Sequence, residues 1–220
     1  MLFTKPAVPG AVKTRLIGEL SAAQAAELHA AFLADLSERL CGGAFELRVA
    51  WALDEGEEFP SHLVVGPAEN LRQVVGDLGA RLYHGLQAAA ERASVVAAIG
   101  SDHPELRPEI VEDAFRRLES GTDAVFGPVP DGGYYLVGLR CEAVRREIFE
   151  NIPWSTESVL DMSLERCRQL GLSIELLPGG HDIDVPHDLR QLAGRLSQQG
   201  TGCPRTRRLL MQWGRLEAAR

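Results

Sequence analysis

The chain has 220 residues, of which 45% are hydrophobic and 25% are charged, and this composition excludes a disordered protein. Its formal net charge of −8 argues against broad electrostatic binding of nucleic acid. No apolar run is long enough to span a membrane, and the first residues lack the apolar core of a signal peptide. We therefore expect a cytoplasmic protein with a single domain over residues 1–220; its oligomeric state stays open.

Strand-like and helix-like segments alternate along the chain, which predicts an α/β fold with a mostly parallel sheet covered by helices. The segments expected as strands are 2–4, 45–53, 62–65, 95–100, 123–127, 134–139 and 173–177. Those expected as helices are 21–40, 77–92, 108–118, 142–149, 156–170, one that begins at Pro186, and a C-terminal helix over 204–219. Ligands of such sheets bind at the carboxyl ends of the strands, so the polar residues that follow predicted strands are the candidate site.

The first polar segment is the loop of residues 5–15, directly after the first strand. It contains Lys5 and Lys13, the two lysines of a chain with 21 arginines, and also Arg15. Small residues such as Gly10 let the backbone approach a diphosphate, whose charge Lys13 and Arg15 can neutralise. The loop has neither Walker A nor G-x-G-x-x-G spacing, so a solvated basic loop is an equally good interpretation.

Asp102 follows the apolar segment 95–100, which is expected as a central strand buried on both faces. A carboxylate at that position can hold Mg²⁺ or Mn²⁺ and leave room for waters and substrate phosphates. An aspartate two residues before Pro104 also caps turns, which is the alternative interpretation. His103 is a less suitable ligand, since a hard cation prefers oxygen.

Asp182 and Asp184 alternate around Ile183, so in extended backbone both carboxylates face the same side. Such a pair presents two oxygen ligands to one cation. Asp184 or Asp188 could instead lie at a helix terminus, stabilised by the helix dipole, and for Asp188 we prefer that interpretation. With Asp102, the pair predicts a metal site formed on successive strand ends.

A further polar segment, Asp131-Gly132-Gly133-Tyr134, separates two predicted strands. The Asp-Gly pair is typical of a tight hairpin turn, and the glycines also permit close approach to a bound group. We expect a hairpin that contacts substrate, with Asp131 accepting a sugar hydroxyl or serving as general base. Trp154 could stack on a ligand, or it could be part of a lid or anchor the core.

Six short motifs occur in a fixed order: Pro9–Leu16, Gly76–Arg81, Gly100–Pro104, Gly127–Leu136, Ile152–Thr156 and Asp182–Asp184. This series resembles the bacterial nucleotide-diphospho-sugar transferase-like family, which has the glycosyltransferase A fold. Some members of that family carry the name arsenosugar-biosynthesis glycosyltransferase. The series is also similar, more distantly, to the guanylyltransferases that activate phospholactate or phosphoenolpyruvate.

The resemblance implies a Rossmann-like α/β/α fold with a nucleotide over the first strand and its following loop. It implies phosphate or nucleotide contacts for the residues of the first two motifs: Gly10, Lys13, Thr14, Arg15 and Asp77. The metal ligands would be Asp102, Asp182 and Asp184, holding Mg²⁺ or Mn²⁺. Only Leu2 and Phe3 precede the loop, which leaves open a short first strand or a start codon placed too far downstream.

The function we expect is metal-dependent transfer of a glycosyl group from a nucleotide sugar to a small-molecule acceptor. Lys13 and Arg15 would stabilise the charge that develops on the diphosphate, and Asp131 would orient or deprotonate the acceptor. One alternative is a nucleotidyltransferase that joins a nucleoside triphosphate to a phosphorylated small molecule and releases pyrophosphate. Another is a catalytically silent nucleotide-binding regulator.

Overall fold

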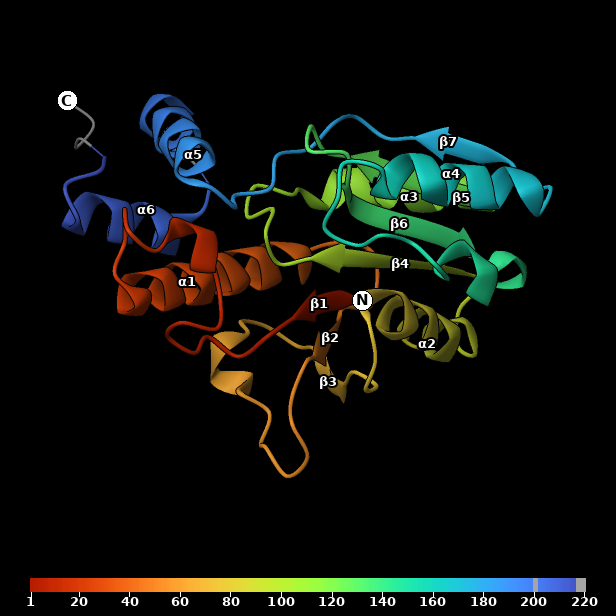
Figure 1. Ribbon diagram of the computed structural model, residues 1–220, viewed down its shortest axis with the longest axis horizontal. Coiled ribbons are helices and arrows are strands. Elements are labelled where there is room, and N and C mark those ends of the chain that lie inside the picture. The colour runs from red at the N-terminus through yellow and green to blue at the C-terminus, as the bar shows by residue number, and fades with distance from the viewer. Residues whose placement is uncertain (200–201, 217–220) are drawn as a thin grey trace.

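The computed structural model describes residues 1–199 and 202–216, and its strands form one sheet of seven (Figure 1). Within these residues the strand order is β3-β2-β1-β4-β6-β5-β7, and β6 runs antiparallel to both of its neighbours. The strands are β1 (Leu2–Thr4), β2 (Arg48–Trp51), β3 (Glu69–Arg72), β4 (Val95–Gly100), β5 (Ala124–Pro128), β6 (Tyr134–Arg140) and β7 (Ile174–Leu176). The predicted α/β fold with a mostly parallel sheet is confirmed.

Helices cover both faces of this sheet and give three layers. The helices are α1 (Ala22–Leu40), α2 (Leu78–Ala90), α3 (Pro108–Glu119), α4 (Val159–Gln169), α5 (Pro186–Gln199) and α6 (Pro204–Gln212). Successive strand residues point to opposite faces. Leu2 packs in the core with α1 and α3, whereas Phe3 packs in the other core with α2 and α4. Leu2 is fully buried and Phe3 is 8% exposed, so β1 is central despite its length.

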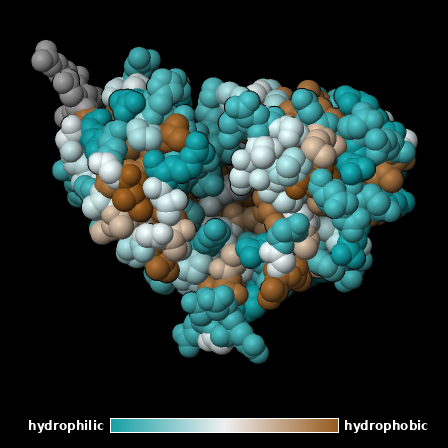
Figure 2. All heavy atoms as spheres, viewed as in Figure 1, coloured by the Kyte–Doolittle hydropathy of each residue, from teal (hydrophilic) through white to brown (hydrophobic). Residues whose placement is uncertain are grey.

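A third apolar cluster joins α1 to α5 and α6, beside the carboxyl ends of the parallel strands (Figure 1). Phe32 and Leu28 of α1 are fully buried in it. Asp35 is 2% exposed and accepts hydrogen bonds from the backbone nitrogens of Arg205 and Thr206, so it satisfies the first turn of α6. The surface in Figure 2 is hollowed between this cluster and the helices that cover the sheet.

Local sequence signals explain where α1 begins and where α6 ends. Ser21 and Gln24 form a reciprocal capping box at the start of α1, as expected for an N-terminal serine. The C-terminal helix begins at the expected Pro204, but the prediction that it extends over 204–219 is wrong. It ends at Gln212, because Gly214 has a φ of 66° and two backbone hydrogen bonds close a Schellman turn there. Residues 217–219 lie outside the described residues.

Two other expected elements are also wrong. Residues 62–65 are not a strand, since Ser61–Leu63 forms a 3₁₀ turn and the polar segment Glu69–Arg72 forms the edge strand β3 instead. The expected helix 142–149 consists of two short 3₁₀ turns, Cys141–Ala143 and Arg146–Ile148. Within the part of the chain that the structure describes, no helix combines the length and the apolarity that crossing a membrane requires.

Candidate functional site

A pocket of about 430 Å³ opens at the carboxyl ends of β1 and β4. That volume lies within the range of small-molecule sites, and the position is where open α/β sheets bind their ligands. Its lining comes from the loop after β1, from α1 and α2, and from the turns after β3 and β4. The residues that carry polar or charged groups into it include Thr4, Lys5, Lys13, Thr14, Arg15, His29, Gln73, Arg81, Ser101, Asp102, Asp182 and Asp184.

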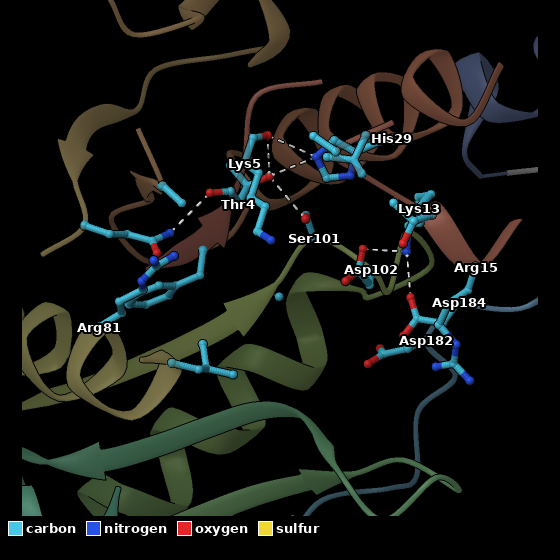
Figure 3. A pocket seen from close by; sticks show the side chains of 18 of the residues that line it. Thr4, Lys5, Lys13, Arg15, His29, Arg81, Ser101, Asp102, Asp182 and Asp184 are labelled. Atoms are coloured by element: carbon cyan, nitrogen blue, oxygen red, sulfur yellow. Dashed lines mark hydrogen bonds and ion pairs between the residues drawn. The ribbon is translucent and has the colours of Figure 1, made fainter. Parts of the chain in front are cut away.

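Lys13 is at the centre of the charged end of this pocket (Figure 3). Its Nζ lies 2.5 Å from Asp102 Oδ1 and 3.1 Å from Asp184 Oδ1, and it donates to the Ile183 carbonyl oxygen at 2.6 Å. The Lys13 side chain is 2% exposed, whereas those of Asp102 and Asp184 are 42% and 36% exposed. The lysine therefore neutralises two predicted metal ligands, and its phosphate contact stays a prediction.

These contacts determine the charge states of Lys13 and Asp102. Burial by itself lowers the pKa of Lys13, but the carboxylates of Asp102 and Asp184 outweigh it, so the pKa is raised and the side chain stays an ammonium. Burial likewise opposes ionisation of Asp102, but the adjacent Lys13 prevails and the pKa of Asp102 is lowered. Lys13 has φ 47° and ψ 37°, a left-handed backbone that is uncommon for a residue other than glycine.

Asp102, Asp182 and Asp184 form what we call the acidic group. Of these three, Asp182 has no ion-pair partner among the described residues. It makes no hydrogen bond or ion pair with any described residue, although it lies beside Asp184 and Asp102 (Figure 3). Burial, followed by the charges of Asp102 and Asp184, raises the pKa of Asp182 from 3.8 to about 7. The Lys13 ammonium thus makes ion pairs with two of these three carboxyl groups, those of Asp102 and Asp184.

The segment that carries Asp182 and Asp184 reaches the site by crossing the edge of the sheet. β7 is separated from β4 by β5 and β6, so these aspartates are not on successive strand ends, and the prediction is wrong in this respect. After β7 the chain bonds along β5, from Leu177 N to Phe126 O and from Gly180 N to Pro128 O. Ile183 N then donates to Asp102 O at 2.9 Å, which places its neighbours beside Asp102.

Donor chemistry favours a hard divalent cation at this end. Carboxylate oxygens are the ligands that Mg²⁺ and Mn²⁺ prefer, and the unpartnered Asp182 carboxyl lacks a compensating charge. Within the described residues, no three His, Cys, Asp or Glu side chains are already arranged as a metal centre. We attribute this to Lys13, whose ammonium lies between Asp102 and Asp184. The residues fit a cation by their chemistry, and the site remains a prediction.

A buried polar network, which was not predicted from the sequence, lies at the base of the pocket. His29 Nε2 lies 3.3 Å from Thr4 Oγ1 and 3.1 Å from the Lys5 carbonyl oxygen, and Thr4 Oγ1 donates to Ser101 Oγ at 3.2 Å (Figure 3). Burial lowers the pKa of His29, so the ring is neutral near pH 7. The one available signal was a histidine on the apolar face of helix 21–40.

The other end of the pocket has no acidic group among its described lining residues and was also missed. Gln73, which follows β3, donates through Nε2 to the carbonyl oxygens of Thr4 at 3.2 Å and Ala50 at 2.8 Å. Both amide hydrogens are used, so Oε1 is left as an acceptor, and no described residue binds it. Leu78 is 44% exposed and Arg81 donates to Gly76 O, and both line the same pocket as Gln73.

A second pocket of about 330 Å³ shares Arg15, Asp182 and Asp184 with the first. Arg15 is exposed and has no hydrogen bond or ion pair with the described residues. Asp188 also lines this pocket, but its Oδ2 accepts from the backbone nitrogens of Asp184 and Val185, which confirms its expected role at the start of α5. The two pockets meet at the acidic group.

Asp131 lines the second pocket and begins the expected turn between β5 and β6. Its Oδ1 accepts from Gly133 N at 3.1 Å, and Val129 N donates to Gly133 O, so the hairpin is confirmed. Gly132 has a φ of 83°, and a Cβ there would lie 2.0 Å from Glu157 O, so only glycine fits. Gly132 and Gly133 line neither pocket; their predicted substrate contact gains no support from their position.

Tyr134 lines the first pocket and packs edge-to-face between Phe126 and Trp154. Burial raises the pKa of Tyr134 far above its ordinary value, so the hydroxyl stays protonated. Trp154 lines neither pocket and belongs to the core cluster between the sheet, α2 and α4. Of the roles left open for Trp154, its position favours the core anchor.

Three residues of the first two motifs differ in whether they line a pocket. Thr14 lines the first pocket, and its implied nucleotide contact stays a prediction. Gly10 has a φ of 81° in an exposed turn and lines neither pocket. Asp77 is the N-cap of α2, where Oδ1 accepts from Ala80 N at 2.8 Å, and it lies outside the lining of both pockets. Its predicted phosphate contact therefore has no geometric support.

Solved structures with the same architecture include two that are named as transferases and one that is named as a synthetase. A protein from Desulfovibrio desulfuricans G20, provisionally named a nucleotide-diphospho-sugar transferase, is 30% identical, with 96% of this chain and 92% of that chain covered and a TM-score of 0.87. A cytidylyltransferase from Leptospira borgpetersenii serovar Hardjo-bovis is 10% identical over 97% of this chain and 93% of that chain, with a TM-score of 0.61. A CMP:2-keto-3-deoxy-manno-octonic acid synthetase complexed with CTP is 13% identical over 90% and 97%, with a TM-score of 0.57. The last two share the fold alone.

No curated protein matches the chain. A family model matches residues 37–156, which is more than half of the chain and includes Asp102, Asp131 and Trp154. The match and the 30% identity over nearly the whole chain agree with the resemblance inferred from the motifs. The chain therefore belongs to the family described as "Uncharacterized protein conserved in bacteria (DUF2064)".

Proposed function

We propose that this protein is a cation-dependent transferase that transfers a glycosyl group from a nucleotide sugar to a small-molecule acceptor. The observation that carries the proposal is the junction of two pockets at Asp182 and Asp184, beside Lys13 and Asp102. One pocket has room for the nucleotide, and the other has room for an acceptor. The name of the 30% identical protein supports the same class of donor.

The two ends of the first pocket suit the two ends of a nucleotide. At the charged end, Asp102, Asp182 and Asp184 would hold Mg²⁺ or Mn²⁺, which would neutralise the diphosphate and the leaving charge. Lys13 and Arg15 would bind phosphate oxygens. At the other end, the base would lie against Leu78 and donate an N–H to Gln73 Oε1.

The second pocket would hold the acceptor. Asp131 lies there with one carboxyl oxygen engaged by Gly133 N and the other without a described partner. That oxygen is available to accept the proton of an acceptor hydroxyl or to orient it. Because Asp182 and Asp184 line both pockets, an acceptor there would lie next to the bond that breaks.

Arg15 favours one other reaction, nucleotidyl transfer. Its guanidinium has no described partner and lines both pockets, so it could bind the phosphate of a phosphorylated acceptor. An acceptor phosphate would attack the α-phosphate of a nucleoside triphosphate and needs no general base. The two reactions differ in product: nucleoside diphosphate for glycosyl transfer, and pyrophosphate for nucleotidyl transfer.

A thermal-shift panel tests the proposal first. Nucleoside triphosphates and nucleotide sugars are each added with Mg²⁺, with Mn²⁺ or with a chelator. A ligand at 100 times its dissociation constant stabilises the folded state by about 2.7 kcal/mol, which raises the midpoint by several degrees. We expect a cation-dependent shift that is larger for a nucleotide sugar. No shift with any ligand would contradict the proposal, and it would equally contradict a catalytically silent protein that binds nucleotide.

A further inference from the structure

Lys13 is fully engaged by the acidic end of the pocket. An ammonium has three N–H donors, and three oxygens surround this one: Asp102 Oδ1, Asp184 Oδ1 and the Ile183 carbonyl. The Phe32 ring centroid lies 5.5 Å from Nζ and covers it from the side of α1. In this arrangement Lys13 has no donor left for a phosphate.

The same two aspartates are the ligands proposed for a divalent cation. A cation that uses their carboxyl oxygens would share them with the ammonium and lie only a few ångströms from it. Two positive charges at that separation repel each other, and the Lys13 side chain, which is 2% exposed, has little water around it to weaken the repulsion. A divalent cation and the Lys13 ammonium are therefore competitors for Asp102 and Asp184.

We infer that Lys13 is an exchangeable counter-ion: it holds Asp102 and Asp184 until a divalent cation binds them, and it is then released into the nucleotide pocket that it lines. Its flexible four-carbon chain lets the ammonium move without movement of the loop. Once released, Lys13 has donors for a diphosphate. Cation and nucleotide should then bind cooperatively, because the first ligand frees a contact for the second. The inference rests on the proposed function.

Competitive acylation tests the exchange, because Lys5 and Lys13 are the two lysines in the chain. Lys5 is exposed and serves as an internal reference in the same loop. Limited acetylation is followed by peptide mass spectrometry, without nucleotide, over a titration with Mn²⁺. We expect the Lys13-to-Lys5 labelling ratio to rise about fivefold or more at saturating Mn²⁺. An unchanged ratio, while calorimetry shows that Mn²⁺ binds, overturns the inference.

Lys13→Met tests the same competition by removing the ammonium that would compete with the divalent cation. Without an ammonium to displace, the variant should bind Mn²⁺ at least about tenfold more tightly and should bind nucleotide more weakly. A merely structural role for Lys13 would weaken both. Lys5→Met is the matched control, since it removes the same charge from the same pocket without freeing an aspartate, and its Mn²⁺ affinity should change little. Circular dichroism checks that each variant is folded.

The outcomes separate this inference from the proposed function. Equal or weaker Mn²⁺ binding by Lys13→Met contradicts the exchange, even if nucleotides bind and are turned over. Absence of Mn²⁺ binding by both the wild type and the variant contradicts it as well. If Mn²⁺ releases Lys13 but no nucleotide binds, the exchange stands and the proposed function fails.

Discussion

The two ends of the first pocket are built in different ways. At the charged end, side chains from distant segments neutralise one another, and Lys13 and Asp184 are 171 positions apart in sequence. At the other end, Gln73 is held by backbone carbonyls of β1 and β2, so the sheet itself orients its amide. The charged end contains partners that a ligand can replace, whereas the other end presents an acceptor in a prearranged position.

This difference predicts how each end responds to a ligand. Binding at the charged end must rearrange ion pairs, so it should depend strongly on cation and salt. Binding at the Gln73 end requires no rearrangement, because both amide hydrogens are already bonded and Oε1 is free among the described residues. Changes at the charged end should therefore have larger effects than changes at the other end.

The largest effect is expected for Asp102→Ala. The variant loses a proposed cation ligand, and cation-dependent nucleotide affinity should fall about 100-fold, or about 2.8 kcal/mol. Lys13 keeps Asp184 and the Ile183 carbonyl, so the fold should persist. Calorimetric titration with Mn²⁺ and nucleotide measures the loss. Asp161→Ala, at an exposed position on α4 outside both pockets, is the control, and equal affinities of the two variants would remove Asp102 from the site.

A smaller effect on binding, but a clear one on turnover, is expected for Asp131→Asn. The amide oxygen can still accept from Gly133 N, so the turn survives while the charge is lost. If Asp131 acts on the acceptor, turnover should fall about tenfold or more, with nucleotide affinity nearly unchanged. Steady-state rates and nucleotide titration measure the two quantities. Full activity would limit Asp131 to its role in the hairpin.

Gln73→Met tests the other end. It removes the acceptor and should cost about 1 kcal/mol, or roughly fivefold, in affinity for nucleotides. Binding of tripolyphosphate, which has no base, should not change. Gln87→Met, at an exposed position on α2, controls for the substitution itself. Equal weakening of both ligands would mean that Gln73 only joins β1 to β2.

The last effect is on stability and not on binding or turnover, and it depends on pH. The pKa of Asp182 is about 7 in the folded protein and about 3.8 when unfolded, so between these values the unfolded state binds fewer protons and stability falls as pH rises. Asp182→Asn removes this loss. In a chelator, its midpoint should exceed that of the wild type by a few degrees at pH 8 and by nearly nothing at pH 3.5. A shift independent of pH would contradict the assigned cause.

Much of the fold was predictable because its signals are local. The apolar run 95–100 and the capping serine of α1 lie where the structure has β4 and the helix start. The edge strand β3 was missed because its residues are polar and its pairing with β2 is what holds it. Of the site, the aspartates and Lys13 were identified, but His29 and Gln73 were not, because their roles come from partners far along the chain.

The sequence by itself determined which groups are present: three aspartates, two lysines near one loop, and an alternation that specifies an α/β sheet. Tertiary structure decided which of them meet. The antiparallel β6 separates β4 from β5, so Asp182 and Asp184 reach Asp102 along a crossing segment and not from a neighbouring strand. Where they meet, the Lys13 ammonium pairs with Asp102 and Asp184, and the carboxyl group of Asp182 has no ion pair with a described residue. The spacing of these residues in the sequence cannot reveal how their charges balance. Electrostatic interaction depends on distance through space and on burial, and only the folded chain sets both.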